Sequence, residues 1–369
     1  MAVPFVDLRP ALVQTAGAWR SNLEHLFEQG QFILGQQVVR FEEQFAAHHG
    51  ARFAVGVGTG TAAIELALRA AALAHTNREV LTSALTSPFT AIAIAAAGCR
   101  PRFADVDPDT LLLDPSDAER RITRKTAAIV AVHLYGQVGD LREYRRLARS
   151  HGLTLIQDAC QAHGARFRSR PLTAFSPCVA YSFYPTKNLG CLGDGGAVLT
   201  NSHAIAGRLR LLRDGGRRNG GQVSVLAAIN SRLDEMQACY LRAFLDKLEE
   251  WNGKRARLAA LYDEGLHGCP GIRLVTRSAD SVHHLYVIRA ARRERLRSWL
   301  QTRGIGNAVH YPVPLHLNPA FRGCGLKRGD LPVSERACRE VVSLPLRPHL
   351  TESQVTEVVE AVRRFYGAR

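Results

Sequence analysis

Short apolar runs alternate with longer amphipathic stretches over roughly the first two thirds of the chain. The runs are rich in β-branched residues and Ala, a pattern that predicts buried strands. The predicted strands cover residues 53–57, 80–82, 102–106, 128–134, 153–157, 180–183 and 197–200. Helical patterns at residues 61–74 and 141–151 lie between them. Such crossovers favour a mostly parallel sheet between helices, in which ligands bind beyond the carboxyl ends of the strands.

The pattern changes after Asn230. One long amphipathic helix is predicted at residues 233–250, and a second ends near Leu266, before a Cys-Pro-Gly sequence that breaks the chain. Later residues predict strands at 285–289 and 308–311 and helices at 292–303 and 352–365. We therefore expect an α/β protein with a large domain over residues 1–245 and a smaller α+β domain over residues 246–369.

The composition narrows the class of protein. The 369 residues are 46% hydrophobic, enough for a large core and, by length, two domains. No apolar run is long enough to span a membrane, and the first residues lack a signal-peptide pattern, so the expected location is cytoplasmic. The eight cysteines include no C-x-x-C pair, and neither a metal site nor a disulfide framework is indicated.

The net charge of +15 is high for an enzyme of this size. It would suit a nucleic acid or an anionic small substrate. The arginines are spread along predicted helices, and no helix-turn-helix or zinc signature is present. An arginine-rich solvated surface explains the charge equally well, so nucleic acid is not the expected partner.

The stretch SFYPTKNLGCLGDGG (182–196) places Lys187 just after a short apolar strand and before a glycine-rich turn. No carboxylate lies close to it in the sequence. Burial disfavours the ammonium form of a lysine, and a neutral amine is a nucleophile toward a carbonyl carbon. A solvated surface lysine is the ordinary alternative.

Two further segments follow predicted strands. In GVGTGTAAIELAL (56–68), a glycine-rich turn opens a helix, so its free amides and the hydroxyls of Thr59 and Thr61 would form a phosphate cradle. It is neither a Walker A loop nor a dinucleotide fingerprint, because Thr61 stands at the third glycine position. In IQDACQAHGA (156–165), Asp158 ends a strand and would pair with a protonated ring nitrogen, or else cap the next helix.

A phosphate cradle, an acid for a ring nitrogen and a lysine for an aldehyde are what pyridoxal phosphate (PLP) requires. In order and spacing these strings, with INSRLDEMQ (229–237), resemble the DegT/DnrJ/EryC1/StrS family of sugar aminotransferases. The resemblance covers nearly the whole chain. It extends to VPFVDL (3–8), FILGQQVVRFEEQFA (32–46), VHLYGQ (133–138), HYPVPLH (310–316) and VVSLPLRPHLT (341–351).

The resemblance implies a fold-type I PLP-dependent transferase that acts as a homodimer. By matched position, Lys187 would bond the cofactor aldehyde, Asp158 would pair with the ring nitrogen, and Gln161 would lie beside the 3-hydroxyl. The phosphate would be held by Ser182, by the amides of Gly60, Thr61 and Ala62, and by Asn230 of the partner subunit.

The resemblance gives less definite roles to three other residues. Arg232 would anchor a carboxylate or phosphate of the substrate, or pair with Asp234 or Glu235 on the helix surface. His310 and Tyr311 would lie near the substrate, or pack in the core.

The implied reaction moves an amino group from an amino acid, usually glutamate in this family, to a nucleotide-diphosphate keto-sugar. The alternatives are a PLP-dependent sugar dehydratase and a regulatory or nucleic-acid-binding relative with weakened catalysis. Some dehydrating relatives replace the lysine with histidine, so Lys187 favours transamination. An oxidoreductase with a dinucleotide site lacks its glycine pattern here.

One position departs from the family pattern. An aromatic residue normally stacks on the cofactor ring, and ungapped alignment places Ser87 there, with Phe89 two residues later. Either Phe89 takes over the stacking through a local shift at Pro88, or the ring is less well covered. Loss of the stack would weaken cofactor retention by roughly 1 kcal/mol.

Overall fold

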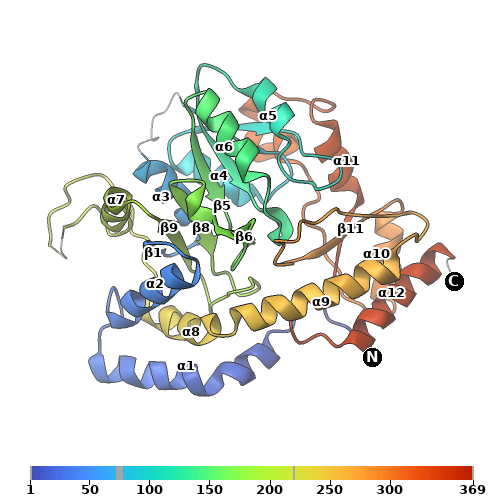
Figure 1. Ribbon diagram of the computed structural model, residues 1–369, viewed down its shortest axis with the longest axis horizontal. Coiled ribbons are helices and arrows are strands. Elements are labelled where there is room, and N and C mark those ends of the chain that lie inside the picture. Colours follow the sequence, from blue (N-terminus) through green and yellow to red (C-terminus); the bar gives the residue numbers. More distant parts are fainter. Residues whose placement is uncertain (1, 72–77, 219–220, 368–369) are drawn as a thin grey trace.

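Two sheets organise the chain (Figure 1). The computed structural model describes residues 2–71, 78–218 and 221–367. Within them, the larger sheet has seven strands in the order β1-β9-β8-β5-β4-β2-β3. They are β1 (Phe53–Val57), β2 (Glu79–Ser83), β3 (Arg100–Ala104), β4 (Thr126–Val132), β5 (Thr154–Asp158), β8 (Cys178–Ser182) and β9 (Gly196–Thr200). Within this sheet β9 alone runs opposite to the other six strands, so the predicted mostly parallel, mixed sheet is confirmed.

Helices cover both faces of this sheet. On one face lie α3 (Gly60–Ala70), α4 (Pro88–Ala96) and α7 (His203–Arg213). The other face is covered by α1 (Arg9–Gln29), α2 (Gln36–His48), α5 (Pro115–Arg121), α6 (Leu141–Ser150) and α8 (Glu235–Leu245). Successive strand residues alternate between the two cores: Val130 packs on the first face, Ile129 and Ala131 on the second. Double coverage explains why these strands are apolar along their whole length.

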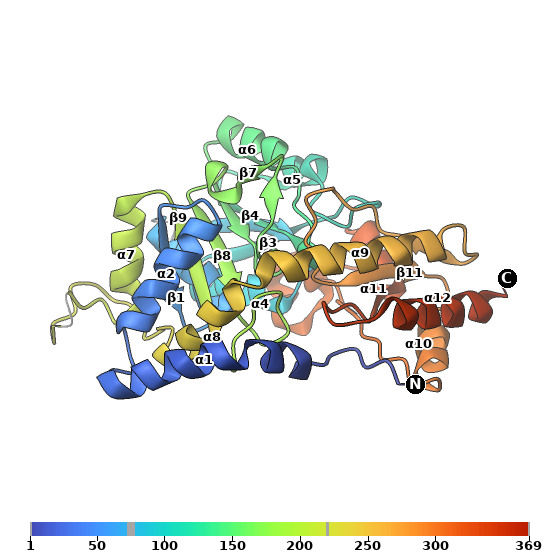
Figure 2. The ribbon, with the colours of Figure 1, turned by 60° about the horizontal axis from the view of Figure 1, so that its bottom comes forward.

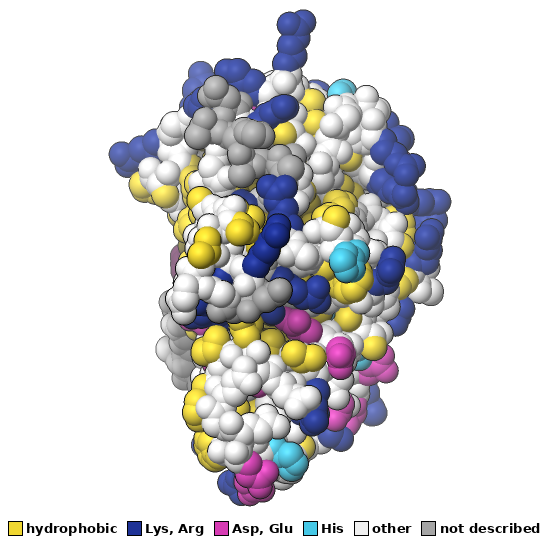
Figure 3. Space-filling view, turned by 90° about the vertical axis from the view of Figure 1, so that its left-hand side faces the viewer, with side chains coloured by type: hydrophobic (Ala, Val, Ile, Leu, Met, Phe, Trp, Pro, Cys, Tyr) yellow, Lys and Arg dark blue, Asp and Glu magenta, His cyan; other side chains and the backbone are white. Residues whose placement is uncertain are grey.

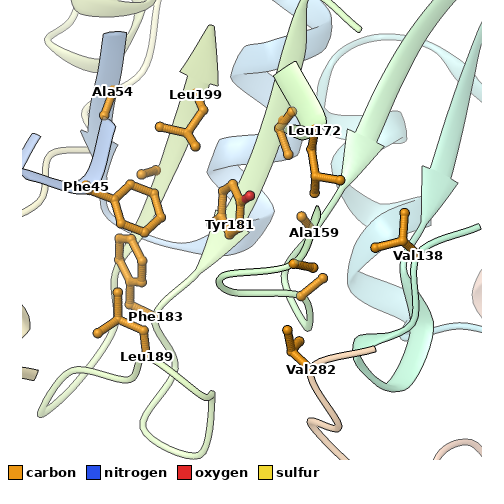
Figure 4. Close-up of a cluster of buried hydrophobic side chains, with 14 of the residues drawn as sticks. Phe45, Ala54, Val138, Ala159, Leu172, Tyr181, Phe183, Leu189, Leu199 and Val282 are labelled. Atoms are coloured by element: carbon orange, nitrogen blue, oxygen red, sulfur yellow. The ribbon is translucent and has the colours of Figure 1, made fainter. Parts of the chain in front are cut away.

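Aromatic rings fill the second core beneath the end of β8. Phe45, Tyr181 and Phe183 pack edge to face there, with ring centroids 5.2 to 5.3 Å from Phe45 (Figure 4). The residues that follow β8 therefore start from a rigid base. A two-stranded hairpin, β6 (Arg166–Phe167) and β7 (Arg170–Pro171), closes this region.

The smaller sheet is antiparallel, with β10 (Ile272–Leu274), β11 (Tyr286–Ala290) and β12 (Val341–Leu344) in that order. Its core includes residues of α9 (Leu248–Leu266), α10 (Arg293–Gln301) and α12 (Glu352–Tyr366), and α11 (Pro332–Glu340) precedes β12. Val3 joins this core through a bridge to Ile305, so the N-terminal segment lies beside the C-terminal helices, while α1 runs below α8 (Figure 2).

Two sequence predictions are wrong. The helix predicted at residues 233–250 is broken after Leu245, and α9 starts anew at Leu248. No Gly or Pro marks this break; it lets α9 pack Leu248 and Trp251 on the large core and Tyr262 on the small one. The strand predicted at residues 308–311 reduces to a single bridge between Ala308 and Ser343. Prolines at 312 and 314 lack the N–H groups that a longer ladder needs.

The remaining element predictions agree with the structure to within a few residues. The exception is the end of the helix predicted at residues 61–74, since residues 72–74 lie outside the described part. The domain boundary near residue 245 stays a prediction, because α9 contributes to both cores. In the described residues, no helix has the length and apolar character needed to cross a membrane.

Candidate active site

A cavity of about 600 Å³ lies at the carboxyl ends of β4, β5 and β8. The start of α3 and residues of the C-terminal part complete its walls. It is lined by Thr59, Gly60, Thr61, Ile64, Thr86, Ser87, Phe89, Thr90, Val132, Asp158, Cys160, Gln161, Ser182, Tyr184, Thr186, Lys187, Asp194, His284, Leu285, His310 and Tyr311. Most residues singled out from the sequence thus meet in one place, Lys187 and Asp158 included.

Lys187 lies in the tight turn after β8. Its amide donates to the carbonyl of Tyr184 at 2.8 Å, and Gly190 approaches the Pro185 carbonyl so closely that a side chain there would collide with it. The Lys187 ammonium has no ion pair among the described residues. Burial lowers the pKa of Lys187 from its ordinary 10.5, although the Asp158 charge acts in the opposite direction. Burial thus shifts the equilibrium of Lys187 toward the neutral, nucleophilic amine.

Asp158, the last residue of β5, is 4% exposed. Its Oδ2 accepts a hydrogen bond from the Thr90 hydroxyl at 2.8 Å, and its Oδ1 accepts one from the Cys160 amide at 3.1 Å. Each carboxylate oxygen keeps a further lone pair for a cation in the cavity. The cap interpretation is wrong, because the chain turns into β6 after Asp158 and no helix follows.

The start of α3 supplies open amides to the cavity. Thr59 caps this helix, its Oγ1 accepting from the Ala62 amide at 3.0 Å. The Gly60 and Thr61 amides have no acceptor within the described chain, whereas the Ala62 amide is already used and Ala62 does not line the cavity. A phosphate contact of the Ala62 amide stays a prediction, because here that amide donates to the cap residue Thr59. Gly60 packs on Ser182 so tightly that a Cβ would collide with it.

Gln161 is held in one orientation. Its Oε1 accepts from the Tyr135 amide at 2.7 Å, and its Nε2 donates to the Tyr311 hydroxyl at 3.1 Å. Burial raises the pKa of Tyr311 to about 12, so its phenol stays protonated at neutral pH. His310 makes a 2.8 Å hydrogen bond through Nδ1 with the Ser343 hydroxyl, and burial lowers its pKa to about 4.

Ser87 and Phe89 both line the cavity near α4. Ser87 caps this helix, its Oγ accepting from the Phe89 amide at 3.4 Å. The Phe89 residue is 59% exposed, so this side of the cavity is open. Whether Phe89 stacks on a bound ring stays a prediction.

Asn230 and Arg232 lie outside this cavity. Asn230 is exposed, and its backbone forms an isolated antiparallel β-bridge with Asp214. The Asp214 carboxylate forms an ion pair with Arg232 at 2.9 Å. The suggested pairing of Arg232 with Asp234 or Glu235 is wrong, because both carboxylates cap helices: Asp234 caps α8 and Glu235 accepts amides at the start of α2. A partner-subunit role for Asn230 stays a prediction.

Sequence reasoning missed two residues of the site, Thr90 and His284. Thr90 is recognisable only through its contact with Asp158, from which it is 68 residues distant. His284 had a weak signal, because it directly precedes a predicted strand.

The sequence model of the DegT/DnrJ/EryC1/StrS aminotransferase family matches residues 16–363. The chain belongs to this family. Over 98% of its length it is 43% identical to 96% of the dTDP-3-amino-3,4,6-trideoxy-alpha-D-glucose transaminase of Streptomyces venezuelae.

Two solved structures of the family resemble it closely. The crystal structure of S. venezuelae DesV matches with a TM-score of 0.96 and 43% identity, covering all of this chain and 99% of that one. Bacillus subtilis NtdA, with its bound cofactor PMP, matches with a TM-score of 0.90 and 28% identity, covering 98% and 85% of the two chains. This DegT/DnrJ/EryC1/StrS member is a PLP-dependent aminotransferase of fold type I.

The cavity fits PLP. A buried amine of lowered pKa, a buried carboxylate with unused lone pairs, and two open amides at a helix start all line it. They match the aldehyde, the basic ring nitrogen and the phosphate of the cofactor. Lys187, Asp158, Gln161, Ser182, Gly60 and Thr61 are the residues that would hold it.

Proposed function

We propose that this aminotransferase moves an amino group from glutamate to the keto group at C3 of a sugar linked to a nucleoside diphosphate. The observation that carries the proposal is that Lys187 and Asp158 line one cavity together with the open amides of α3. The relative from S. venezuelae, named for a 3-amino sugar linked to dTDP, supports the choice of carbon and nucleotide.

Lys187 has two tasks in this proposal. As a neutral amine it would bond the cofactor aldehyde and hold PLP in the cavity until an amino donor takes its place. Bound PLP supplies a ring that accepts electrons from the substrate carbon. Once displaced, Lys187 Nζ would be the general base that takes the proton from the substrate carbon and the acid that gives a proton back.

Asp158 is the group that would keep a positive charge on the ring nitrogen of bound PLP. Its two hydrogen bonds hold the carboxylate in place, so no reorganisation is needed when charge develops. Gln161, bonded at both ends of its amide, places a fixed dipole at the cavity wall. The start of α3 attracts the phosphate through its amides and helix dipole.

The acceptor carries a diphosphate, and the basic surface would attract it. In Figure 3, Lys and Arg side chains are dispersed over the upper part and one edge of the face around α7, while Asp and Glu lie lower down. This dispersed charge favours long-range attraction of a small anion over a continuous nucleic-acid tract.

The working form in this proposal is a homodimer in which Asn230 completes the partner's phosphate site. Apolar side chains are exposed on α1 and α2, between these two helices, in the segment before Asn230 and on α8: Val13, Phe27, Phe32, Ile33, Val39, Val223, Val225 and Met236. Exposed apolar groups of this extent are typical of a protein interface. Sedimentation of the purified protein at twice the monomer mass would support it.

The visible spectrum of the purified protein incubated with PLP tests the function. We expect an absorbance band that glutamate shifts and that Lys187→Ala abolishes. A panel of 3-keto and 4-keto nucleotide sugars, scored by amine formation, then identifies the acceptor. No band after incubation with PLP contradicts the proposal.

A further inference from the structure

A buried chain of side-chain amides begins at the residue after Lys187. Asn188, 4% exposed, donates from Nδ2 to the Val282 carbonyl at 2.8 Å and to Asn252 Oδ1 at 2.8 Å. Asn252, on α9, donates from its own Nδ2 to the His163 carbonyl at 2.9 Å. The two amides thus connect the lysine turn, α9 and the small-domain segment that contains His284.

Backbone carbonyls determine which way each amide points. A carbonyl oxygen accepts only, so the nitrogens of Asn188 and Asn252 must face Val282 and His163. Both N–H groups of Asn188 are then used. Its Oδ1 is left as an acceptor, and the group facing it, at 3.1 Å, is Nδ1 of His284.

The proton of His284 is therefore on Nδ1, and its Nε2 carries a lone pair. His284 lines the cavity. Among the described residues its Nε2 has no hydrogen-bond partner, and they do not bury this atom completely. Burial, together with the nearby Lys187 and Arg255 charges, holds the pKa of His284 well below its ordinary value. The ring is neutral at physiological pH.

We propose that His284 Nε2 accepts a hydrogen bond from a hydroxyl group of the bound sugar, and that Asn188 and Asn252 are positioning residues that impose this tautomer. The proposal rests on the proposed function, since it assigns His284 to the sugar acceptor. The two carboxylates of the amino donor cannot serve Nε2, because they are themselves acceptors, and its amino group is the one that reacts at the cofactor.

The segment around His284 does not depend on its imidazole for anchorage. Val282 donates to the Gly136 carbonyl at 2.9 Å, Leu285 donates to the Tyr135 carbonyl at 3.3 Å, and the Val282 side chain packs in the large core (Figure 4). The imidazole is thus free to serve the ligand, and changing it should leave the backbone in place.

The tautomer is tested on the PLP-loaded enzyme by NMR of ring nitrogens after labelling with ¹⁵N-histidine. The His284 signals are those lost in His284→Phe. We expect Nδ1 protonated and Nε2 bare in the wild type. Asn188→Asp places a negative charge beside Nδ1 and should raise the pKa of His284, so that Nε2 gains a proton. A wild-type proton on Nε2, or no change in Asn188→Asp, overturns the positioning role.

The substrate contact is tested with a dTDP-3-amino sugar and 2-oxoglutarate, the reaction run in reverse. His284→Phe should raise KM for the nucleotide sugar about three- to tenfold, the range of one neutral hydrogen bond. The rate of the glutamate half-reaction, read from the cofactor spectrum, should change by less than about twofold, which is below that range. An unchanged KM, or an equal loss in both half-reactions, contradicts the contact.

His283→Asn is the matched control. His283 is adjacent, does not line the cavity, and has a φ of 46°, which Asn tolerates. It should leave KM for the nucleotide sugar unchanged, and a rise equal to that of His284→Phe also contradicts the contact. If the wild type uses no nucleotide sugar, the proposed function fails and the contact with it; the NMR result, which needs no substrate, still decides the positioning role.

Discussion

The sheet-edge wall of the cavity and the wall from the C-terminal part are built differently. The sheet-edge wall carries a carboxylate and an amine: Asp158 is the last residue of β5, and Lys187 lies in the turn that follows β8. The wall from the C-terminal part carries His284, His310 and Tyr311. Each of these side chains is held by a hydrogen bond to a residue far away in the sequence, at separations of 96, 33 and 150 positions respectively. One wall is made by strand ends and the other by long-range side-chain contacts.

The two walls also differ in charge. Burial keeps His284 and His310 neutral, and it keeps the Tyr311 phenol protonated. A wall of uncharged hydrogen-bonding groups suits sugar hydroxyls, whereas the carboxylate and amine suit the cofactor. The difference implies that cofactor chemistry and acceptor choice reside in separate walls. Variants of the sheet-edge wall should change turnover and the PLP spectrum, whereas variants of the other wall should change KM for the nucleotide sugar.

The largest effect is expected at Lys187. Lys187→Ala removes both the nucleophile and the proton carrier, so transamination should fall at least about 10⁴-fold. The absorbance band of bound PLP should vanish with it. Lys125→Ala, at an exposed lysine, is the control and should keep both. Substantial activity in Lys187→Ala would show that Lys187 is neither the nucleophile nor the proton carrier.

Asp158→Asn should cost about 10²–10³-fold in turnover, the scale of losing one preorganised electrostatic partner. The amide keeps the size of the side chain and an acceptor oxygen but no charge. Single-turnover kinetics with glutamate measures the loss. A normal rate in a PLP-loaded Asp158→Asn protein would show that the ring nitrogen lies elsewhere.

The pH dependence of PLP capture tests how the sheet-edge wall sets the pKa of Lys187. Capture needs the neutral amine, so its rate should rise with pH through the pKa of Lys187, and burial places this midpoint below 10.5. The negative charge of Asp158 raises that pKa, so Asp158→Asn should move the midpoint to still lower pH. Stopped-flow absorbance of the apoenzyme mixed with PLP records both curves, and an upward shift in Asp158→Asn contradicts the sign.

Tyr311→Phe probes the other wall with a smaller effect. It removes the hydroxyl that accepts from Gln161 and should raise KM for the nucleotide sugar several-fold, consistent with about 1 kcal/mol for one hydrogen bond. The PLP spectrum should stay unchanged. Loss of cofactor from this variant would mean that the two walls are not separable.

The smallest change is expected for Phe89→Ala. With more than half of Phe89 exposed, its contribution to a stack should not exceed about 1 kcal/mol, or roughly fivefold in PLP affinity. Equilibrium titration of the apoenzyme with PLP measures it. A much larger loss would show that Phe89 fully takes the place of the missing aromatic.

The strand ends explain why so much of the sheet-edge wall could be predicted. Apolar runs bounded by glycine or polar residues marked β5 and β8; Asp158 ends the first strand, and Lys187 lies in the turn after the second. The contact between the Thr59 hydroxyl and the Ala62 amide, by contrast, depends on the local helix geometry and was not predicted.

The arrangement of the wall from the C-terminal part could not be predicted from the sequence pattern. The role of His284 depends on Asn188 and Asn252, and their approach follows from the path of α9. That path was itself mispredicted, because the break after Leu245 has no local signal and is set by packing on two cores. Long-range contacts of this kind are not encoded in local periodicity.

A crystal structure of the enzyme loaded with PLP tests the central claim most directly. The account predicts continuous electron density from Lys187 Nζ to the cofactor and an Asp158 carboxylate oxygen within hydrogen-bond distance of the ring nitrogen. Cofactor density that is joined to another residue, or a ring nitrogen that faces away from Asp158, would contradict it.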